Sequence, residues 1–235
     1  MHEWLAEHLS ALKTQFINNM SHELRTPLYH VIGLSTLSQR VNDLEKAKDY
    51  AQKIRVAGER LLGIVSSVLD FSAVESGDLQ VRNDAFDLPL LLVYLTERFT
   101  EKANAKGLIF EIQRPELISQ TMTGDARRLQ QVLEELLGNA VKFTEQGKVI
   151  FAVVPGANRI EFVVSDSGVG MTTEQLNAGF KPFQQGDGSA QRRFGGLGLG
   201  LALTEHLAKL MGGQIAVSSK VGEGSTFRLT LPMNN

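Results

Sequence analysis

His22 and Glu23 are the first residues whose types and spacing could carry chemistry. They lie within Phe16-Ile-Asn-Asn-Met-Ser-His-Glu-Leu-Arg-Thr-Pro27. Neutral imidazole is a nucleophile near neutral pH because its ordinary pKa is about 6.5, and only the ring nitrogen without hydrogen attacks. Glu23 could hold the proton on the other nitrogen and act as general base. Pro27 removes a hydrogen bond to residue 23, so we expect a helix bend that presents His22 to a partner.

Three later segments decide whether this pair is more than an exposed helical His-Glu. Asn139 and Lys142 lie three residues apart and share a helix face, which pairs an oxygen ligand for Mg²⁺ with a cation for phosphate. Phe143 could pack on a purine ring. Either polar residue alone would more often be a solvated surface residue, so the spacing matters only together with the segments that follow.

Two glycine-containing segments supply the remaining signals. Asp166-Ser-Gly-Val-Gly170 follows an expected strand and offers a carboxylate for a purine amino group, with glycines that admit close approach of the backbone. Gly195-Gly-Leu-Gly-Leu-Gly200 opens an expected helix, where backbone N–H groups and the helix dipole favour phosphate. It lacks the strand context of a dinucleotide fingerprint. Gly222-Glu-Gly-Ser-Thr226 is a further tight glycine turn.

The elements that must position these residues divide the chain in two. Apolar residues recur at steps of three and four from Leu5 to about Ser38, and again from Leu44 to Val68 after a polar break at Gln39–Asp43. Two long helices with a short connection predict an antiparallel hairpin, whose wide apolar face favours a symmetric dimer and a four-helix bundle. Glu75-Ser-Gly-Asp78 marks the boundary, so we divide the chain into 1–76 and 77–235.

Short strands and helices alternate after that boundary. Expected strands and helices are, in order, strand Leu79–Arg82, helix Leu88 to about Ala105, strand Leu108–Gln113, a helix capped by Asp125 that runs through Asn139, the hairpin of Lys148–Val154 and Ile160–Ser165, a helix from about Leu197 to Met211, and strands Gln214–Ser219 and Thr226–Leu231. The polar segment Gln184–Arg193 is typical of a lid. The pattern predicts an α+β protein in which the hairpin precedes an α/β sandwich.

Composition excludes several classes of function. The chain has 235 residues, 43% hydrophobic and 21% charged, which is ordinary for one or two globular domains. A net charge of −2 without a basic patch argues against nucleic acid as a partner. The absence of cysteine excludes disulfides and thiolate metal sites and fits a reducing cytosol. No apolar run approaches the roughly 18 residues of a membrane span.

Taken together and in order, these segments resemble the dimerisation/phosphoacceptor and catalytic ATP-binding domains of a sensor histidine kinase. The resemblance covers nearly the whole chain, and the wording of its motifs is similar to the hybrid-kinase branch. The boxes fall at Ser21–Pro27 (H-box), Glu135–Thr144 (N-box), Asp166–Gly170 (G1), Phe180–Phe183 (F-box) and Gly196–Gly200 (G2). The resemblance implies a nucleotide domain of the GHKL (Bergerat) type, shared with gyrase and heat-shock chaperone ATPases, and ATP and Mg²⁺ as ligands.

The same resemblance implies a role for each matching residue. His22 takes the γ-phosphoryl group, Glu23 assists, and Thr26 positions water when a partner is dephosphorylated. The nucleotide residues comprise Asp166 for adenine, Thr226 on the adenine side, Lys142 and one of Arg192 or Arg193 for phosphates, Phe143, and the glycines Gly168, Gly170, Gly196, Gly198 and Gly200. Asn139 binds Mg²⁺. The implied partners are a second copy of the chain and the receiver domain of a response regulator.

Glu135 departs from the family pattern, which often has a second asparagine four residues before Asn139. A carboxylate there resembles the gyrase and chaperone ATPases, in which it is a general base for hydrolysis. It could equally be a stronger Mg²⁺ ligand.

The leading hypothesis is a histidine autokinase that is also a phosphatase toward its receiver, in the cytoplasmic portion of a larger membrane-bound sensor. A phosphatase-dominant or signalling-dead homologue and a gyrase-like or chaperone-like ATPase remain the alternatives. The signal, the receiver and the choice between cis and trans phosphorylation are not encoded in any residue pattern.

Overall fold

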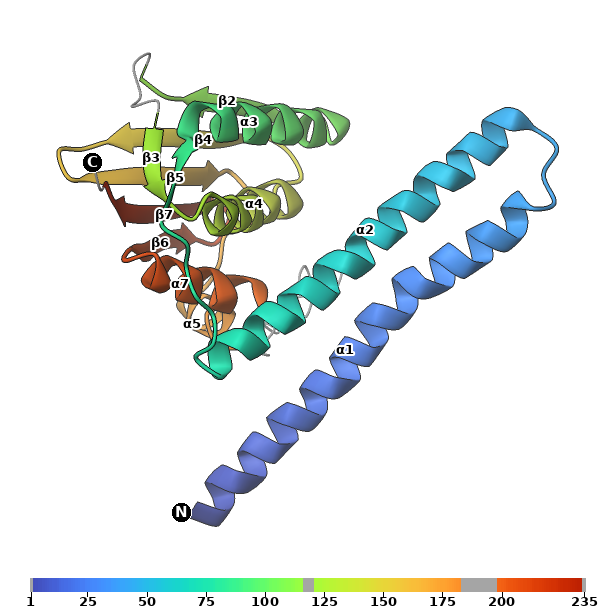
Figure 1. Ribbon diagram of the computed structural model, residues 1–235, viewed down its shortest axis with the longest axis horizontal. Helices are drawn as coiled ribbons and strands as arrows, with labels where there is room; N and C mark the ends of the chain where they lie inside the picture. The colour runs from blue at the N-terminus through green and yellow to red at the C-terminus, as the bar shows by residue number, and fades with distance from the viewer. Residues whose placement is uncertain (1, 116–120, 183–197, 234–235) are drawn as a thin grey trace.

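The computed structural model describes residues 2–115, 121–182 and 198–233, and its first two elements form a long antiparallel hairpin. Helix α1 (His2–Ser38) and helix α2 (Leu44–Glu75) run side by side (Figure 1), as the apolar periodicity predicts. Asp43 begins α2, because its carboxylate accepts hydrogen bonds from the backbone N–H groups of Glu45 and Lys46 at 2.9 and 3.2 Å. The polar break therefore works as a connection and a helix cap.

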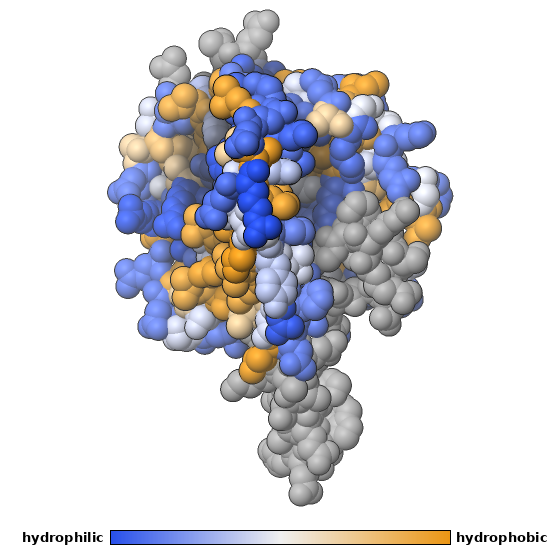
Figure 2. Space-filling model, turned by 90° about the vertical axis from the view of Figure 1, so that its right-hand side faces the viewer, coloured by the Kyte–Doolittle hydropathy of each residue, from blue (hydrophilic) through white to orange (hydrophobic). Residues whose placement is uncertain are grey.

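The hairpin buries little of its apolar surface within one chain. Pro27 of α1 and Ala57 of α2 are buried, whereas an exposed apolar stripe continues along α2 through Leu62, Val65 and Leu69. Figure 2 shows hydrophobic side chains gathered on the face of the molecule that carries the hairpin. Leu61 and Val68, which are half-buried, lie beside this exposed stripe on the same helix.

The expected strand at Leu79–Arg82 is wrong. Residues 78–83 form no ladder; the N–H groups of Asp78 and Leu79 return to the Ala73 carbonyl at the end of α2, and the Arg82 N–H donates to Asp125 Oδ2 at 3.0 Å. The strand that leads into the next helix is β1 (Asp84–Asp87), which pairs antiparallel with β3 (Thr121–Gly124). The alternation at 79–82 reflects the packing of Leu79 against the core of the domain.

A five-stranded mixed sheet forms the back of the second domain. Its strands, in spatial order, are β2 (Ile109–Gln113), β4 (Lys148–Pro155), β5 (Arg159–Asp166), β7 (Gly224–Pro232) and β6 (Gln214–Lys220). Only the β2–β4 pair is parallel. The β4–β5 hairpin is confirmed. The antiparallel pairing of β5 with β7 brings Asp166, at the end of β5, beside Ser225 near the start of β7.

Three helices cover one face of this sheet (Figure 1). They are α3 (Leu88–Ala105), α4 (Ala126–Phe143) and α7 (Gly200–Leu210); the short α5 (Thr173–Gly179) follows β5. Asp125 caps α4 as expected, through a bond from the Arg128 N–H at 3.0 Å. The core between helices and sheet contains the fully buried side chains Leu92, Leu95, Phe99, Leu133, Leu136, Leu137, Phe151, Phe162 and Leu229.

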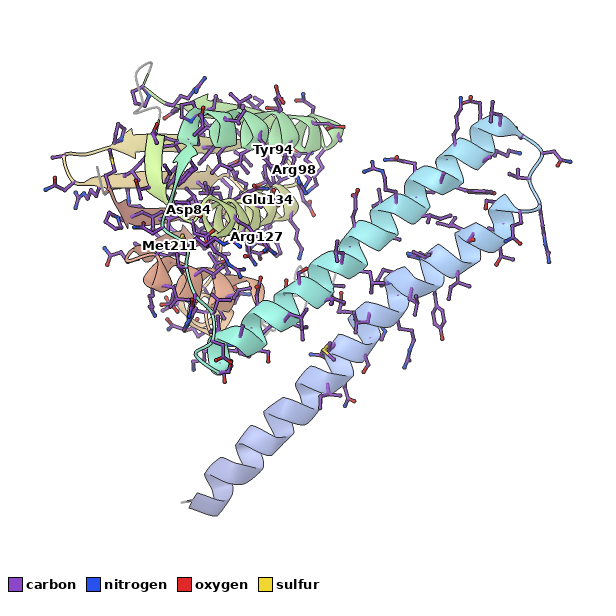
Figure 3. The ribbon with its side chains drawn as sticks, viewed as in Figure 1. Asp84, Tyr94, Arg98, Arg127, Glu134 and Met211 are labelled. Atoms are coloured by element: carbon purple, nitrogen blue, oxygen red, sulfur yellow. The ribbon has the colours of Figure 1, made fainter. Side chains whose placement is uncertain are left out.

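Helix α4 also makes polar contacts with α3 and with α2. Glu134 pairs with Arg98 of α3 at 3.3 Å, and Arg98 also lies over the Tyr94 ring, 5.8 Å from its centroid (Figure 3). Near its start, Arg128 donates to Asp70 of α2 at 2.8 Å, and Gln131 donates to the other Asp70 oxygen at 2.7 Å. Only 12% and 14% of the Arg128 and Asp70 side chains are exposed, so this contact joins the hairpin to the α/β domain.

The fold class is thus confirmed as a helical hairpin followed by an α/β domain with a mixed sheet. In the part of the chain that the structure describes, every helix is too short or too polar to cross a lipid bilayer.

Candidate active site

Glu135, Asn139 and Lys142 form one face of α4, and the structure brings them together as the spacing predicts. The Asn139 amide nitrogen donates to Glu135 Oε1 at 3.0 Å. The amide oxygen of Asn139 is not used in this bond and is a group that can coordinate a cation. Burial raises the pKa of Glu135, and the hydrogen bond from Asn139 and the charge of Lys142 act in the opposite direction. The face therefore combines two oxygen donors with an ammonium group.

Gly200 allows the first turn of α7 to approach this face. A Cβ at position 200 would lie 2.0 Å from Glu135 Oε1, so any larger residue would displace the carboxylate. The glycine is therefore explained by packing against Glu135 as well as by the expected phosphate cradle. Gly198, two residues earlier, has a φ of +67°, which favours glycine.

Mg²⁺ fits this donor set. Carboxylate and amide oxygens are the ligands that Mg²⁺ prefers, and it usually completes its shell with water and substrate phosphates. Among the described residues no cluster of three or more histidine, cysteine, aspartate or glutamate side chains could hold a metal ion. A site at Asn139 and Glu135 therefore suits an ion that arrives with a nucleotide better than one held by protein alone.

Lys142 lies half-buried at the end of α4. Burial lowers its pKa, Glu135 raises it, Arg60 lowers it and Glu23 raises it. Arg60 and Glu23 belong to the hairpin, so the N-box lysine is within electrostatic range of the helix that carries His22. Lys142 Nζ also lies 5.0 Å from the centroid of the Phe143 ring.

Asp166 ends β5 with its carboxylate partly buried. Burial raises its pKa, whereas backbone hydrogen bonds from Gly168 and Ser225 lower it. The Gly168 N–H donates to Asp166 Oδ1 at 2.8 Å, and this bond together with that from Ser225 holds the carboxylate in place.

The glycines after Asp166 are required by close backbone contacts. A Cβ at Gly168 would lie 2.4 Å from the Phe143 carbonyl oxygen, and one at Gly170, where φ is +64°, would lie 2.0 Å from the Lys220 carbonyl oxygen. These glycines are therefore needed for close packing against the protein backbone, in addition to the close approach to a purine ring that the sequence predicts. Both glycines tie the Asp166 turn to neighbouring elements.

Thr226 lies next to this turn. Its hydroxyl is 3.0 Å from the Ser165 hydroxyl, and the register pairs Ser165 with Thr226 and Asp166 with Ser225. The structure therefore places Thr226 at the same sheet edge as Asp166.

His22 is exposed on α1, which continues through Pro27 as one helix. Glu23 is paired with Arg60 of α2, whose Nη2 donates to Glu23 Oε2 at 3.1 Å, rather than with His22. The Thr26 hydroxyl donates to the His22 carbonyl oxygen at 3.3 Å. The expected Glu23–His22 contact is therefore replaced in this structure by a contact between the two helices of the hairpin.

Some expected site residues lie outside the described part of the chain. They are Arg192, Arg193 and Gly196, together with the segment Gln184–Arg193.

Two contributors to the site were missed from the sequence. Arg60 is one. The other is Lys106, whose ammonium donates to the carbonyl oxygens of Val141, Lys142 and Thr144 at 2.7, 3.1 and 3.1 Å. Cations stabilise helix C-termini, so Lys106 fixes the end of α4 that presents Lys142. Neither residue belongs to a local motif, because each acts on an element distant in sequence.

Comparison with known proteins agrees with this geometry. Residues 12–77 match the family model described as the His Kinase A (phospho-acceptor) domain, and residues 124–235 match that of the histidine kinase-, DNA gyrase B- and HSP90-like ATPase. These two domains define the class: a phosphoacceptor helical hairpin joined to an ATPase domain. The chain belongs to the histidine kinases of two-component signal transduction.

Relatives and solved structures extend over both domains. The circadian input-output histidine kinase CikA of Synechococcus elongatus is 40% identical over 97% of this chain and 31% of its own length. The autoinducer 2 sensor kinase/phosphatase LuxQ of Vibrio cholerae is 33% identical over 97% of this chain and 27% of its own length. Full-length ShkA, solved in complex with AMPPNP, matches with a TM-score of 0.69 at 29% identity, over 96% of this chain and 46% of that one. The chain thus spans less than a third of these curated relatives.

Proposed function

We propose that the chain is an ATP-dependent histidine autokinase that phosphorylates His22 and passes the phosphoryl group to an aspartate of a response-regulator receiver domain. One observation carries the proposal. Glu135, Asn139 and Lys142 share one face of α4, on which the Asn139 amide donates to Glu135 Oε1 at 3.0 Å. The Arg128–Asp70 pair at 2.8 Å holds the same helix against the hairpin that carries His22, so the proposed nucleotide-binding helix and the phosphoacceptor hairpin are in contact. ShkA's complex with AMPPNP supports a nucleotide on the same domain.

Each residue has a defined part in this function. Asp166 accepts a hydrogen bond from the adenine amino group, with Thr226, Phe143, Gly168 and Gly170 around the base. Lys142 binds phosphate, as do Arg192 or Arg193 and the glycines Gly196, Gly198 and Gly200. Asn139 and Glu135 hold Mg²⁺, which neutralises charge on the phosphates when bound. Glu23 takes the ring proton of His22.

The assembly is proposed as a homodimer. The exposed stripe at Leu62, Val65 and Leu69, together with Leu28 and Ile32 on α1, provides an apolar face that a second hairpin would cover. We assign residues 1–76 to this dimerisation domain and 77–235 to the catalytic domain, since Gly77, with φ of +74°, ends α2. The greater length of the relatives supports a place in a larger sensor kinase, and we further propose that this sensor is membrane-bound and that the chain belongs to its cytoplasmic part.

Phosphatase activity toward the receiver is the second half of the proposal. LuxQ carries both activities in its name, and Thr26 stands one helical turn from His22, where its hydroxyl could direct a water at a docked phosphoaspartate.

The direct test is incubation with γ-labelled ATP and Mg²⁺, followed by treatment of the protein with acid and alkali. We expect acid-labile, alkali-stable label in the wild type, none in His22→Gln, and normal label in the matched control His30→Gln on the same exposed helix. Full labelling of His22→Gln would refute the assignment. Asn139→Ala and Asp166→Asn should also abolish labelling.

ATP hydrolysis is a second candidate function, favoured by Glu135. Burial raises the pKa of this carboxyl and makes the carboxylate a stronger base for water. Steady release of phosphate from ATP by His22→Gln at the wild-type rate, without a phosphoenzyme in either protein, would favour this reading over the kinase.

A further inference from the structure

Arg60 and Glu23 form an ion pair between the two helices of the hairpin, directly beside His22. The two atoms that meet, Arg60 Nη2 and Glu23 Oε2, are 3.1 Å apart. Only 18% of the Glu23 side chain is exposed, whereas 55% of Arg60 is. The Glu23 oxygen that accepts this hydrogen bond is occupied by the guanidinium. In this state Glu23 is withheld from His22, while much of the guanidinium is still open.

The helix that carries Arg60 also contacts the nucleotide domain. Arg60 and Glu23 both act on the pKa of Lys142, after the larger effects of burial and Glu135. The Asp70–Arg128 contact at 2.8 Å holds α4 against α2, about ten residues or roughly 15 Å further along α2 from Arg60. A phosphoryl group that reaches His22 therefore arrives close to Arg60, because the guanidinium already contacts the neighbouring residue Glu23 at 3.1 Å.

We propose that Arg60 is a second phosphoryl-binding cation for the autokinase reaction, supplied by the hairpin, which holds Glu23 before transfer and binds the γ-phosphoryl oxygens during it. The inference rests on the proposed function and adds a residue to it. A guanidinium suits this part because its planar donors grip phosphate oxygens in pairs, and an arginine that meets the transferring group stabilises the charge of the transition state.

The exchange of partners by Arg60 would also release the base. The lone pair of the unprotonated His22 nitrogen forms the bond to the γ-phosphorus. The bond between that phosphorus and the bridging oxygen breaks, and ADP leaves with the electron pair. The proton on the other ring nitrogen passes to Glu23, which is free to accept it once Arg60 has turned to the phosphoryl oxygens. No further reactant is needed.

The test compares Arg60→Ala with Arg55→Ala in the full chain. Arg55 is on the same helix and pairs with Glu59 one turn away, with 59% of its side chain exposed, so its removal deletes the same charge without touching Glu23. The measurements are the initial rate of His22 labelling at saturating ATP, the KM for ATP, the equilibrium Kd for ATP and the melting temperature.

Arg60→Ala should slow labelling at saturating ATP at least about tenfold, since loss of one transition-state donor commonly costs more than that. The Kd for ATP should stay within about twofold of wild type, because Arg60 meets the phosphoryl group only during transfer. Arg60→Lys should recover part of the rate, and millimolar guanidinium ion should partly rescue Arg60→Ala but not Glu23→Gln. Arg55→Ala should behave as wild type.

Labelling of Arg60→Ala at the rate of Arg55→Ala would overturn the inference. So would a loss of rate that is matched by a weaker Kd or a lowered melting temperature, or that neither lysine nor guanidinium restores, because each of these marks a structural role. Failure of the proposed function gives a different result, namely label that remains in His22→Gln whatever occupies position 60.

Discussion

Thr26 is the residue at which we expect the proposed kinase and phosphatase activities to separate, one helical turn from His22. Its side chain donates to the His22 carbonyl at 3.3 Å and has no basicity with which to activate an imidazole. Thr26→Ala should leave autophosphorylation within about twofold and slow dephosphorylation of the cognate receiver about tenfold or more, the usual scale for loss of a positioning group. The measurement is the lifetime of phosphate on a purified receiver.

Thr36→Ala is the matched control for this change. Thr36 lies on the same helix and makes the same kind of bond, to the Ile32 carbonyl at 2.9 Å, but it is ten residues further along. Equal loss of kinase and phosphatase activity in Thr26→Ala would contradict the division of roles.

Glu135 makes the stability of the nucleotide domain depend on pH. Burial raises its pKa above the ordinary value of 4.5, so between these two values the folded state binds more protons than the unfolded state. Stability must then fall as pH rises through this window and stay low above it. Glu135→Gln keeps an acceptor for Asn139 and removes the titration.

The expected result is that Glu135→Gln melts at a higher temperature than wild type at pH 8, and that the difference shrinks as the pH approaches 4.5. Asp166, whose pKa is also raised by burial, contributes equally to both proteins and cancels from the difference. Thermal melting across this range, without nucleotide, measures the effect. A difference that is constant with pH would show that Glu135 is not held in a protonation-sensitive site.

At the scale of elements, the long helices and the strands of the five-stranded sheet were predictable, whereas the four-residue strands β1 and β3 were not. Helices α1, α2 and α4 were found because a 3.6-residue period, the polar break at Gln39–Asp43 and the cap at Asp125 are local signals. The β1–β3 pair was missed because four-residue strands derive their pairing from a partner about 35 residues away, which no local pattern reveals.

The site divides in the same way. Asn139 and Lys142 could be placed together because helical spacing alone puts them on one face. The sequence could not predict that Glu23 contacts Arg60 instead of His22. Glu23 and Arg60 are 37 residues apart in the sequence, and they meet only because α2 lies against α1. Contacts between residues on one helix could be predicted from their spacing, whereas contacts between residues on different elements required the structure.

The contact of α2 with α4 gives a prediction at this scale. Asp70→Asn removes the charge that holds Arg128, and the two domains should separate more readily because a largely buried pair loses one partner. Trypsin should then cut after Arg82, in the segment between the hairpin and β1, several-fold faster than in wild type. Asp49→Asn, which breaks an exposed pair within α2, should leave the rate unchanged. Equal rates in both variants would contradict a holding role for Asp70.

The whole molecule is predicted to be a dimer through the hairpin. Leu62 is 67% exposed within the stripe of α2, and burying a charge there would be unfavourable, so Leu62→Asp should shift the protein at micromolar concentration from dimer to monomer. Light scattering gives the mass directly. Leu90→Asp, at a site equally exposed (68%) on α3 of the catalytic domain, should remain dimeric. A monomeric wild type would contradict the bundle.

The Asp70–Arg128 contact has a consequence for building chimeric receptors. Gly77 is the natural point at which to join a hairpin from another protein to this catalytic domain. Asp70 lies before Gly77 in the sequence, however, whereas the two residues that contact Asp70, Arg128 and Gln131, lie after it. A fusion at Gly77 keeps Arg128 but replaces Asp70 by whatever residue the donor hairpin has at that position. Donor hairpins with aspartate at the position equivalent to Asp70 should therefore yield regulated fusions more often than donors chosen for overall similarity, and moving the splice point upstream of Leu69 should restore regulation to the rest.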